Sequence, residues 1–212
     1  MECILCQSIN NFEIHFGNKN KTYYKCNNCD LLFLDSSHLP AFFEEKSRYL
    51  THENNIENKG YVSFLMTAIE PALSFFKKGM KILDFGCGPG PTLNLILKNN
   101  GFDCDIYDPI FYPEIDRTKK YDAIFATECF EHFFNPLKEL KMIDTFLQSN
   151  GFLIIMTELW SETKPLSEWW YSKDITHVTF YKKSTFEYIA DTFHYTIVYE
   201  NNKNILILKK DG

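Results

Sequence analysis

The chain has few of the features on which nucleic-acid-binding and membrane proteins depend. Only two of its 22 basic residues are arginines, Arg48 and Arg117, and its formal net charge is -6. Arginine makes the bidentate contacts that hold phosphates, so a nucleic-acid partner is not expected. The sequence has no apolar run long enough to span a bilayer and no secretory signal at its start. These absences predict a cytoplasmic protein without a membrane partner.

Disulfides are rare in the cytoplasm, yet the chain has seven cysteines. Four of them form two pairs with the same spacing, Cys3-x-x-Cys6 and Cys26-x-x-Cys29. This spacing lets both thiolates of a pair reach one ion, and two such pairs complete a tetrahedral sulfur site. The pattern predicts a zinc ribbon over residues 1–35. Because four protein ligands leave no open coordination position, the zinc is expected to be structural.

The most informative segment is Ile82-Leu83-Asp84-Phe85-Gly86-Cys87-Gly88-Pro89-Gly90. An apolar strand runs through an acid into a glycine turn that opens a helix, and such a turn brings backbone N–H groups close to a ligand. The carboxylate of Asp84 would repel a pyrophosphate and attract an ammonium group. The third glycine also follows the second by two positions, whereas the dinucleotide fingerprint has three. The nucleotide with a cationic amino-acid tail is S-adenosylmethionine, which the segment therefore favours.

Residues 80–212 alternate predicted strands and helices, which is typical of a doubly wound α/β sheet. Asp108 stands just past the second strand, 22 positions beyond Gly86, where an acid commonly binds ribose hydroxyls. Only 12 residues separate Asp108 from Tyr121, too few for a helix and a third strand, so an irregular turn is expected there. The predicted strands cover 81–85, 104–107, 121–127, 152–157, 195–199 and 205–208, and the predicted helices 92–99, a segment from Asn135-Pro136, and a last one capped by Ser184 and ending at Phe193.

The glycine turn resembles motif I of class I S-adenosylmethionine-dependent methyltransferases. The whole chain is similar to a bacterial group of these enzymes with an N-terminal zinc ribbon, through the four paired cysteines, the glycine turn and residues 49–55, 107–109, 128–132 and 169–181. The resemblance implies a Rossmann-like doubly wound sheet of the class I methyltransferase type with an antiparallel last strand, and this chain departs from the family in its abbreviated strand-three region. The cofactor-binding candidates are Asp84, Gly86, Cys87, Gly88, Asp108, Thr127 and Glu128.

Residues 36–79 are predicted to form a helical connector, with a short helix near residues 40–50 and an amphipathic helix over residues 60–76. In the class I fold a helix before the first strand often caps the cofactor. The candidate wall residues are therefore Tyr49, His52, Asn55 and Tyr61. Ordinary packing of the helix faces is the alternative.

Three side chains are candidates for catalysis. Glu128 and His132 follow the predicted strand 121–127, and Glu131-His132 resembles a Glu-His pair found there in many small-molecule methyltransferases. The favoured alternative is that Glu131 and His132 pair with each other or with the backbone and only shape the loop. His177 lies in an aromatic segment, residues 169–181, that is expected to wall the methyl group, and it could accept a proton from the acceptor. A packed aromatic loop with His177 bonded to the backbone is equally open.

The leading hypothesis is an enzyme that transfers a methyl group from S-adenosylmethionine to a small-molecule acceptor, leaving S-adenosylhomocysteine. One alternative is a methyltransferase that acts on RNA or protein docked through the zinc ribbon. Another is a protein that binds the cofactor without catalysis. The sequence does not identify the acceptor.

Overall fold

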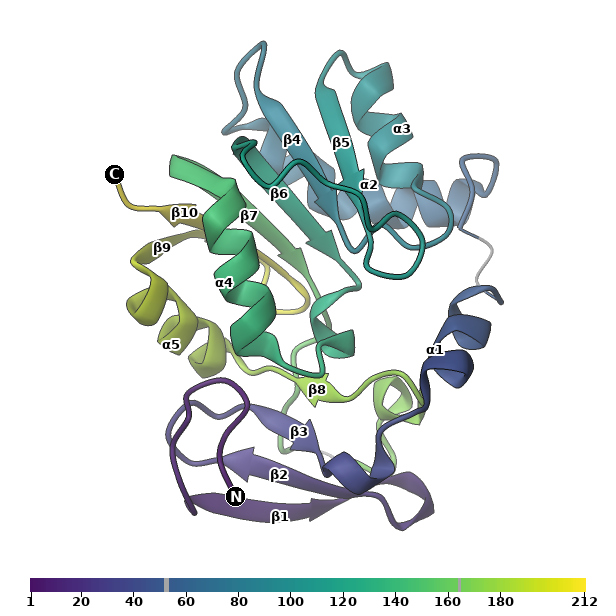
Figure 1. Cartoon of the computed structure of the whole chain (residues 1–212), viewed down its shortest axis with the longest axis vertical. Helices are drawn as coiled ribbons and strands as arrows, with labels where there is room; N and C mark the ends of the chain where they lie inside the picture. The colour runs from purple at the N-terminus through teal and green to yellow at the C-terminus, as the bar shows by residue number, and fades with distance from the viewer. Residues whose placement is uncertain (52–53, 164) are drawn as a thin grey trace.

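Figure 1 shows a computed structural model of the chain, which describes residues 1–51, 54–163 and 165–212. A six-stranded sheet, ordered β5-β4-β6-β7-β10-β9, lies above a smaller four-stranded sheet, ordered β1-β2-β3-β8. The strands of the large sheet are β4 (Lys81–Phe85), β5 (Asp103–Tyr107), β6 (Tyr121–Thr127), β7 (Leu147–Met156), β9 (Tyr195–Glu200) and β10 (Ile205–Lys210). The first four are mutually parallel, and β10 runs antiparallel to both β7 and β9.

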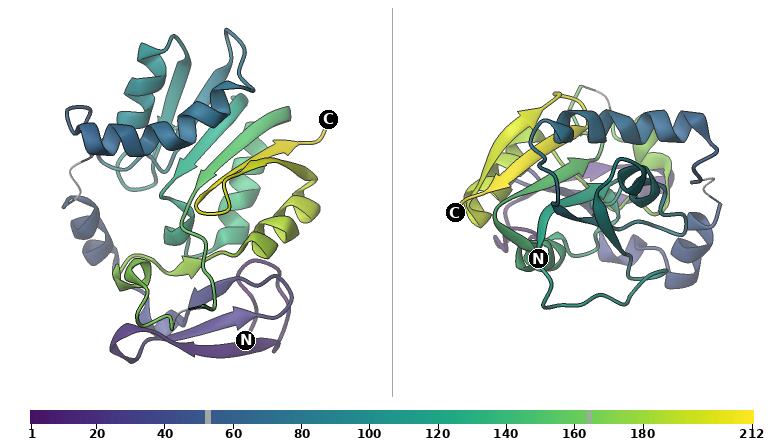
Figure 2. Two further views of the ribbon diagram at one scale, coloured as in Figure 1. Left: turned by 180° about the vertical axis from the view of Figure 1, so that it is seen from behind. Right: turned by 90° about the horizontal axis from the view of Figure 1, so that it is seen from above.

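Helices cover both faces of the large sheet, as Figures 1 and 2 show. The helices are α1 (Phe42–Tyr49), α2 (Lys59–Leu73), α3 (Thr92–Asn99), α4 (Pro136–Phe146) and α5 (Lys183–Phe193). Helices α2 and α3 pack in one apolar cluster, while α4 and α5 pack in another on the opposite face. Successive strand residues alternate between the faces, so Ile124 joins the second cluster and Phe125 the first. The doubly wound α/β arrangement expected from the sequence is confirmed.

The segment between β5 and β6 contains neither a helix nor a strand over residues 109–120, all of which are described. A tight turn takes their place, in which the Asp108 and Tyr112 backbones exchange hydrogen bonds of 3.1 and 3.0 Å. This is the irregular turn that the short spacing predicts, and it leaves β5 at the edge of the sheet.

Several predicted boundaries are wrong; helix α2, for example, ends at Leu73 instead of residue 76. Strand β7 begins at Leu147 instead of Phe152, with an irregularity in its register against β6. Helix α5 begins at Lys183, so Ser184 is not its cap; the capping residue is Lys182, and the Thr185 hydroxyl in the first turn accepts its backbone N–H at 3.1 Å. The Ser184 hydroxyl instead donates to Asp30 at 2.7 Å, which ties the main sheet's layer to the N-terminal lobe.

The small sheet combines the N-terminal residues with a strand from much later in the chain. Its strands are β1 (Phe12–Phe16), β2 (Thr22–Cys26), β3 (Leu32–Leu34) and β8 (Thr179–Phe180). Strand β8 pairs antiparallel with β3, with Leu32 opposite Phe180 and Phe33 opposite Thr179. The N-terminal lobe therefore shares a strand with the segment that follows β7. The division of the chain into units 1–35, 36–79 and 80–212 stays a prediction.

Short 3-10 turns complete the described chain: η1 (Asn18–Asn20), η2 (Ser36–His38), η3 (Phe130–His132) and η4 (Trp170–Lys173). No helix in the described ranges combines the length and the apolar character needed to cross a bilayer.

Candidate active site

The four paired cysteines come together in the N-terminal lobe. Their sulfur atoms all lie within 4.8 Å of one another. Cys3 Sγ is 3.7 Å from Cys29 Sγ, and Cys6 Sγ is 3.5 Å from Cys26 Sγ. A tetrahedron with Zn–S bonds of about 2.3 Å has sulfur–sulfur edges of about 3.8 Å, so the cluster has the size that one zinc ion requires.

The turn after β4 is shaped by two glycines with left-handed backbones. Gly86 has φ 76°, and a Cβ built on it would lie 2.3 Å from Cys129 Sγ. Gly88 has φ 63° and nothing within 4 Å of such a Cβ, so its backbone borders open space. Gly86 and Cys87 donate their N–H groups to the Tyr107 carbonyl at 2.8 and 3.2 Å. The glycines thus let the chain reverse tightly against β5 and against Cys129.

Two acids stand at the ends of β4 and β5. Asp84 is buried, and this burial raises the pKa of its carboxyl to about 7; an N–H from Asn94 opposes the shift. Asp108 accepts the backbone N–H of Gly88 at 3.0 Å and that of Ile110 at 2.8 Å. It therefore holds the glycine turn against the turn after β5, a role that the sequence spacing did not indicate.

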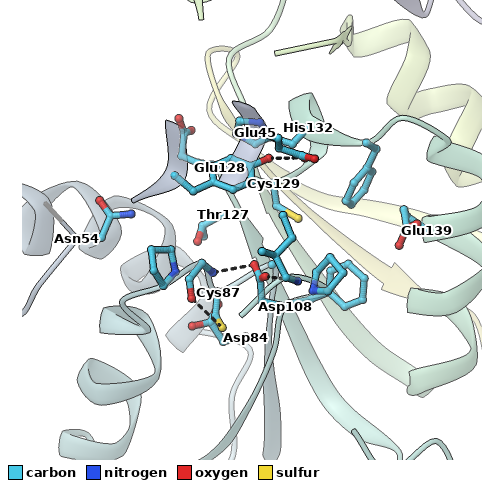
Figure 3. A pocket seen from close by; sticks show the side chains of 18 of the residues that line it. Glu45, Asn54, Asp84, Cys87, Asp108, Thr127, Glu128, Cys129, His132 and Glu139 are labelled. Atoms are coloured by element: carbon cyan, nitrogen blue, oxygen red, sulfur yellow. Dashed lines mark hydrogen bonds between the residues drawn. The ribbon is translucent and has the colours of Figure 1, made fainter. Parts of the chain in front are cut away.

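A cavity of about 580 Å³ opens past the carboxyl ends of β4, β5 and β6, where open α/β sheets bind their ligands. Figure 3 shows Asp84, Cys87 and Asp108 on one side of it and Glu128, Cys129 and His132 on the other. Its lining includes all seven predicted cofactor-binding residues: Asp84, Gly86, Cys87, Gly88, Asp108, Thr127 and Glu128. Their contact with a cofactor stays a prediction.

The connector contributes a wall of this cavity. Tyr49 and Tyr61 line it, as the sequence suggested, but Asn54 lines it in place of Asn55, whose side chain caps the N–H groups of residues 57 and 58. The fourth wall candidate, His52, lies outside the described residues. The Asn54 carbonyl oxygen would be 2.1 Å from a Cβ on Gly90, so this glycine lets the connector pack on the turn.

Sequence reasoning missed two acids of the lining, Glu45 and Glu139. Glu45 lies one helical turn before Tyr49 and accepts its hydroxyl at 2.9 Å. The four-residue spacing on one helix face was the signal that would have found it. Glu139 lies in the first turn of α4, where no motif marked it.

Glu128 has an unusual backbone and an unusual environment. Its φ of 49° is a left-handed conformation that residues other than glycine rarely adopt, and such strain is common at functional sites. Burial, together with the nearby Glu131 and Glu158, raises the pKa of its carboxyl to about 9. Its N–H donates to the Met156 carbonyl at 2.8 Å, which anchors the strained residue to the end of β7.

His132 and His177 come together at the same end of the cavity, with ring centres 4.8 Å apart. Each bonds to the backbone: His132 Nδ1 to the Thr176 carbonyl at 3.0 Å and His177 Nδ1 to the Tyr171 carbonyl at 2.7 Å. Burial lowers the pKa of His177 to about 4, so its ring is neutral at pH 7. The backbone hydrogen bond of the second alternative is present, and His177 also borders the cavity, so its role as a proton acceptor stays a prediction.

The aromatic residues before His177 do not form the expected wall. Within residues 165–181, all described, His177 alone lines the cavity. Trp169 and Tyr171 pack instead on Phe180 and the N-terminal lobe, in an apolar cluster with Tyr23, Leu32, Leu34, Trp160, Leu166 and Val178. The pairing of β8 with β3 explains the difference, because it packs these aromatic side chains against the small sheet. Cys129 is a buried thiol.

Comparison with solved structures supports this architecture. The chain is similar to the PH0226 protein from Pyrococcus horikoshii OT3, with 16% identity and a TM-score of 0.50 over 78% of this chain and 99% of that one. It is also similar to the BH2331 protein from Bacillus halodurans C-125, with 12% identity and a TM-score of 0.50 over 71% of this chain and 100% of that one. At these identities the likeness establishes the fold alone. No curated protein matches the chain.

A sequence model described as a methyltransferase domain matches residues 58–200, which include the whole glycine turn, His132 and His177. The match covers most of the chain and begins in the connector, just before α2. With the fold and the acid-containing glycine turn, it assigns the chain: it belongs to the methyltransferase domain family and is an S-adenosylmethionine-dependent methyltransferase.

Proposed function

We propose that this methyltransferase acts on a small-molecule acceptor that enters the cavity beside Glu128, His132 and His177. The main support is that the glycine turn and these three side chains line one cavity. Its volume of about 580 Å³ lies in the range of small-molecule sites, about 300–1,000 Å³. The net charge of -6 and the scarcity of arginine oppose an extended RNA substrate.

The residues of the glycine turn would bind and orient S-adenosylmethionine, which supplies a methyl group on a positively charged sulfur. Asp84 would attract the ammonium group of its tail, and Asp108 would accept ribose hydroxyls on the lone pairs left by its backbone bonds. Thr127, Glu128 and Cys87 would border the rest of the molecule. Most of the rate enhancement would come from holding the acceptor in line with the methyl group.

His177 is the first candidate for contact with the acceptor, and Glu128 and His132 are the reserve candidates. A neutral imidazole accepts a hydrogen bond from a hydroxyl or amine, so His177 would orient the nucleophile even without a full proton transfer. We infer that His177→Ala lowers turnover and leaves cofactor affinity nearly unchanged, the pattern of an interaction made mainly in the transition state. Equal losses of turnover and cofactor binding would make His177 structural.

We infer that Cys3, Cys6, Cys26 and Cys29 hold one structural zinc ion. The support is the size of the sulfur cluster and the paired spacing. The metal would fix the N-terminal lobe as a zinc ribbon, and through β3 it would support β8 and the segment that carries His177. It would supply no chemistry to the reaction.

The function is tested with the full-length protein in two steps. Calorimetry with S-adenosylhomocysteine should give tight binding, and NAD, the matched dinucleotide control, should give none. Incubation with methyl-labelled S-adenosylmethionine and a metabolite extract should then label a small molecule. Label in RNA or protein instead would favour a substrate docked through the ribbon, and binding without any labelled product would favour a protein that only binds the cofactor.

A further inference from the structure

Glu131, His132 and His177 form a second cluster of metal-ligand type, separate from the cysteines. One ligand atom from each of the three residues lies within 4.8 Å of the other two. Glu131 and His132 come from the loop after β6, and His177 comes from the segment before β8. Two hydrogen bonds join these segments: Val178 donates its N–H to the Glu131 carbonyl at 2.8 Å, and the His132 side chain bonds through Nδ1 to the Thr176 carbonyl. The cluster is therefore held from both sides.

The two histidines are locked in the tautomer that metal-binding histidines use. A carbonyl oxygen can only accept a hydrogen bond, so Nδ1 of His132 and Nδ1 of His177 must each carry the proton. In a neutral ring this leaves Nε2 as a bare lone pair. A backbone carbonyl on the far nitrogen is the usual outer partner of a histidine ligand, because it fixes both the tautomer and the ring orientation.

One carboxylate oxygen of Glu131 has no hydrogen-bond partner and faces Nε2 of His132. The residue is fully buried, and Oε2 accepts the Thr157 hydroxyl at 2.8 Å, while Oε1 has no hydrogen-bond donor. Oε1 lies 3.8 Å from Nε2 of His132, so two acceptor atoms face each other across a gap. A buried carboxylate without a full set of partners is costly, and a cation in the gap would satisfy both atoms.

We propose that Glu131, His132 and His177 bind one divalent metal ion at the acceptor end of the cavity, where it takes the reacting oxygen of the substrate. The inference deepens the proposed function and rests on it for the identity of the methyl donor. Two imidazoles and one carboxylate suit first-row ions such as Zn²⁺ or Mn²⁺, and three protein ligands leave coordination positions open. His132 and His177 line the cavity, so the open positions face the substrate.

Bound to such an ion, a substrate hydroxyl becomes acidic enough to lose its proton at neutral pH. The proton passes to water in the cavity. The oxygen then forms a bond to the methyl carbon while the carbon–sulfur bond breaks, and the sulfur keeps the electron pair, which gives the methyl ether and S-adenosylhomocysteine. No oxidant or reductant is needed. With more than one position open, the favoured acceptor is a small molecule that has a second oxygen donor next to the reacting hydroxyl.

Titration of the full-length protein with Mn²⁺, followed by the loss of the free-ion paramagnetic resonance signal, tests the site. Mn²⁺ competes poorly with zinc for a four-thiolate site, so it reports on the histidine cluster. We expect one Mn²⁺ per chain, with enhanced relaxation of water protons because water occupies the open positions. His132→Asn and His177→Asn keep an N–H donor near the Nδ1 position and remove Nε2, and Glu131→Gln keeps the shape of the side chain.

Each of these variants should weaken Mn²⁺ binding at least about 100-fold, beyond the 10–100-fold that loss of an outer hydrogen bond costs. His38→Ala, a histidine change away from the cavity, should bind Mn²⁺ like the wild type. Absence of Mn²⁺ binding, or equal binding by the wild type and all three variants, would overturn the proposal. S-adenosylhomocysteine calorimetry on the same samples separates the metal site from the proposed function. Cofactor binding without Mn²⁺ binding would refute only the metal site. Mn²⁺ binding without cofactor binding would refute only the proposed function.

Discussion

The two ends of the cavity are built in different ways. At the cofactor end, a strand, a glycine turn and a helix follow one another directly, and the end of β5 closes the site through Asp108. At the acceptor end, side chains from α1, from the loop after β6, from α4 and from the segment before β8 meet across the chain. We therefore expect cofactor binding to depend mainly on local backbone geometry and acceptor binding to depend on the docking of the N-terminal lobe.

The largest expected effect comes from Cys26→Ser. Structural zinc contributes on the order of 10 kcal/mol to the folding of small zinc domains, so loss of one ligand should unfold much of the N-terminal lobe. Because β8 pairs with β3, the acceptor end should fail with it, while the glycine turn survives. Metal analysis should find one zinc fewer per chain, and calorimetry should find S-adenosylhomocysteine binding retained.

Cys104→Ser is the matched control, since this buried cysteine in β5 lies outside the cluster and should leave the zinc content unchanged. Full zinc content in Cys26→Ser would contradict the metal site. Complete loss of cofactor binding in that variant would show that the two ends of the cavity are not separable.

Gly86→Ala changes the glycine turn at the cofactor end of the cavity. The added methyl would meet Cys129 Sγ and would sit on a left-handed backbone, for a combined loss of stability of about 2–4 kcal/mol. Thermal unfolding measures this. Gly101→Ala has a similar φ, 84°, but open space around the added atom, so it should lose only about 1–2 kcal/mol. Equal losses in the two variants would mean that contact with Cys129 is not what requires glycine at position 86.

Asp108→Ala should weaken S-adenosylhomocysteine binding by roughly 1–3 kcal/mol, the usual range for hydrogen bonds to a charged group. Part of the loss should come from the turn itself, because Asp108 holds the Gly88 and Ile110 N–H groups. Asp116→Ala is the control, since this exposed acid bonds only within its own loop, to Thr118. Calorimetry that finds the same affinity for Asp108→Ala and the wild type would remove Asp108 from the cofactor site.

The last prediction is a pH dependence of cofactor affinity. In the free protein Asp84 takes up a proton below its pKa of about 7, and a bound ammonium group favours the ionised carboxylate. Binding therefore releases a proton at acidic pH, and affinity should rise about tenfold per pH unit up to about pH 7 and then level off. Calorimetry between pH 5.5 and 7.5 measures the slope. Asp84→Asn should bind more weakly and with a flat profile, and an unchanged slope in that variant would assign the dependence to another group.

The local parts of the fold were predictable. The limits of β4 and α3 agree with the sequence, because an apolar run ends in an acid and a glycine turn that fixes where the strand stops and the helix starts. Asn135 caps α4 by accepting the Lys138 N–H at 3.1 Å, and Pro136 opens that helix, as their types predict. The starts of β7 and α5 were missed because pairing in the sheet and contacts with the N-terminal lobe override the local pattern.

At the acceptor end, the sequence predicted the types of residue but not how they come together. Sequence marked His132 and His177 as separate candidates, but nothing in it places residues about 45 positions apart in one cluster. The Thr176 carbonyl and His132 Nδ1 meet across 44 residues, and the aromatic residues next to His177 turn away under the small sheet. The strained backbone of Glu128 likewise has no sequence signal, because only the surrounding packing maintains it.

The sequence by itself determined the paired cysteines, the order of strands and helices, and the acid and glycines of the cofactor turn. Each of these depends on neighbours a few residues away, where backbone geometry and side-chain type act directly. Only the tertiary structure decided that β8 joins the N-terminal sheet, that Asp108 braces the glycine turn, and that Glu131, His132 and His177 converge. Those contacts join distant segments, and their partners are selected by the packing of the whole chain and by the need to pair buried polar groups.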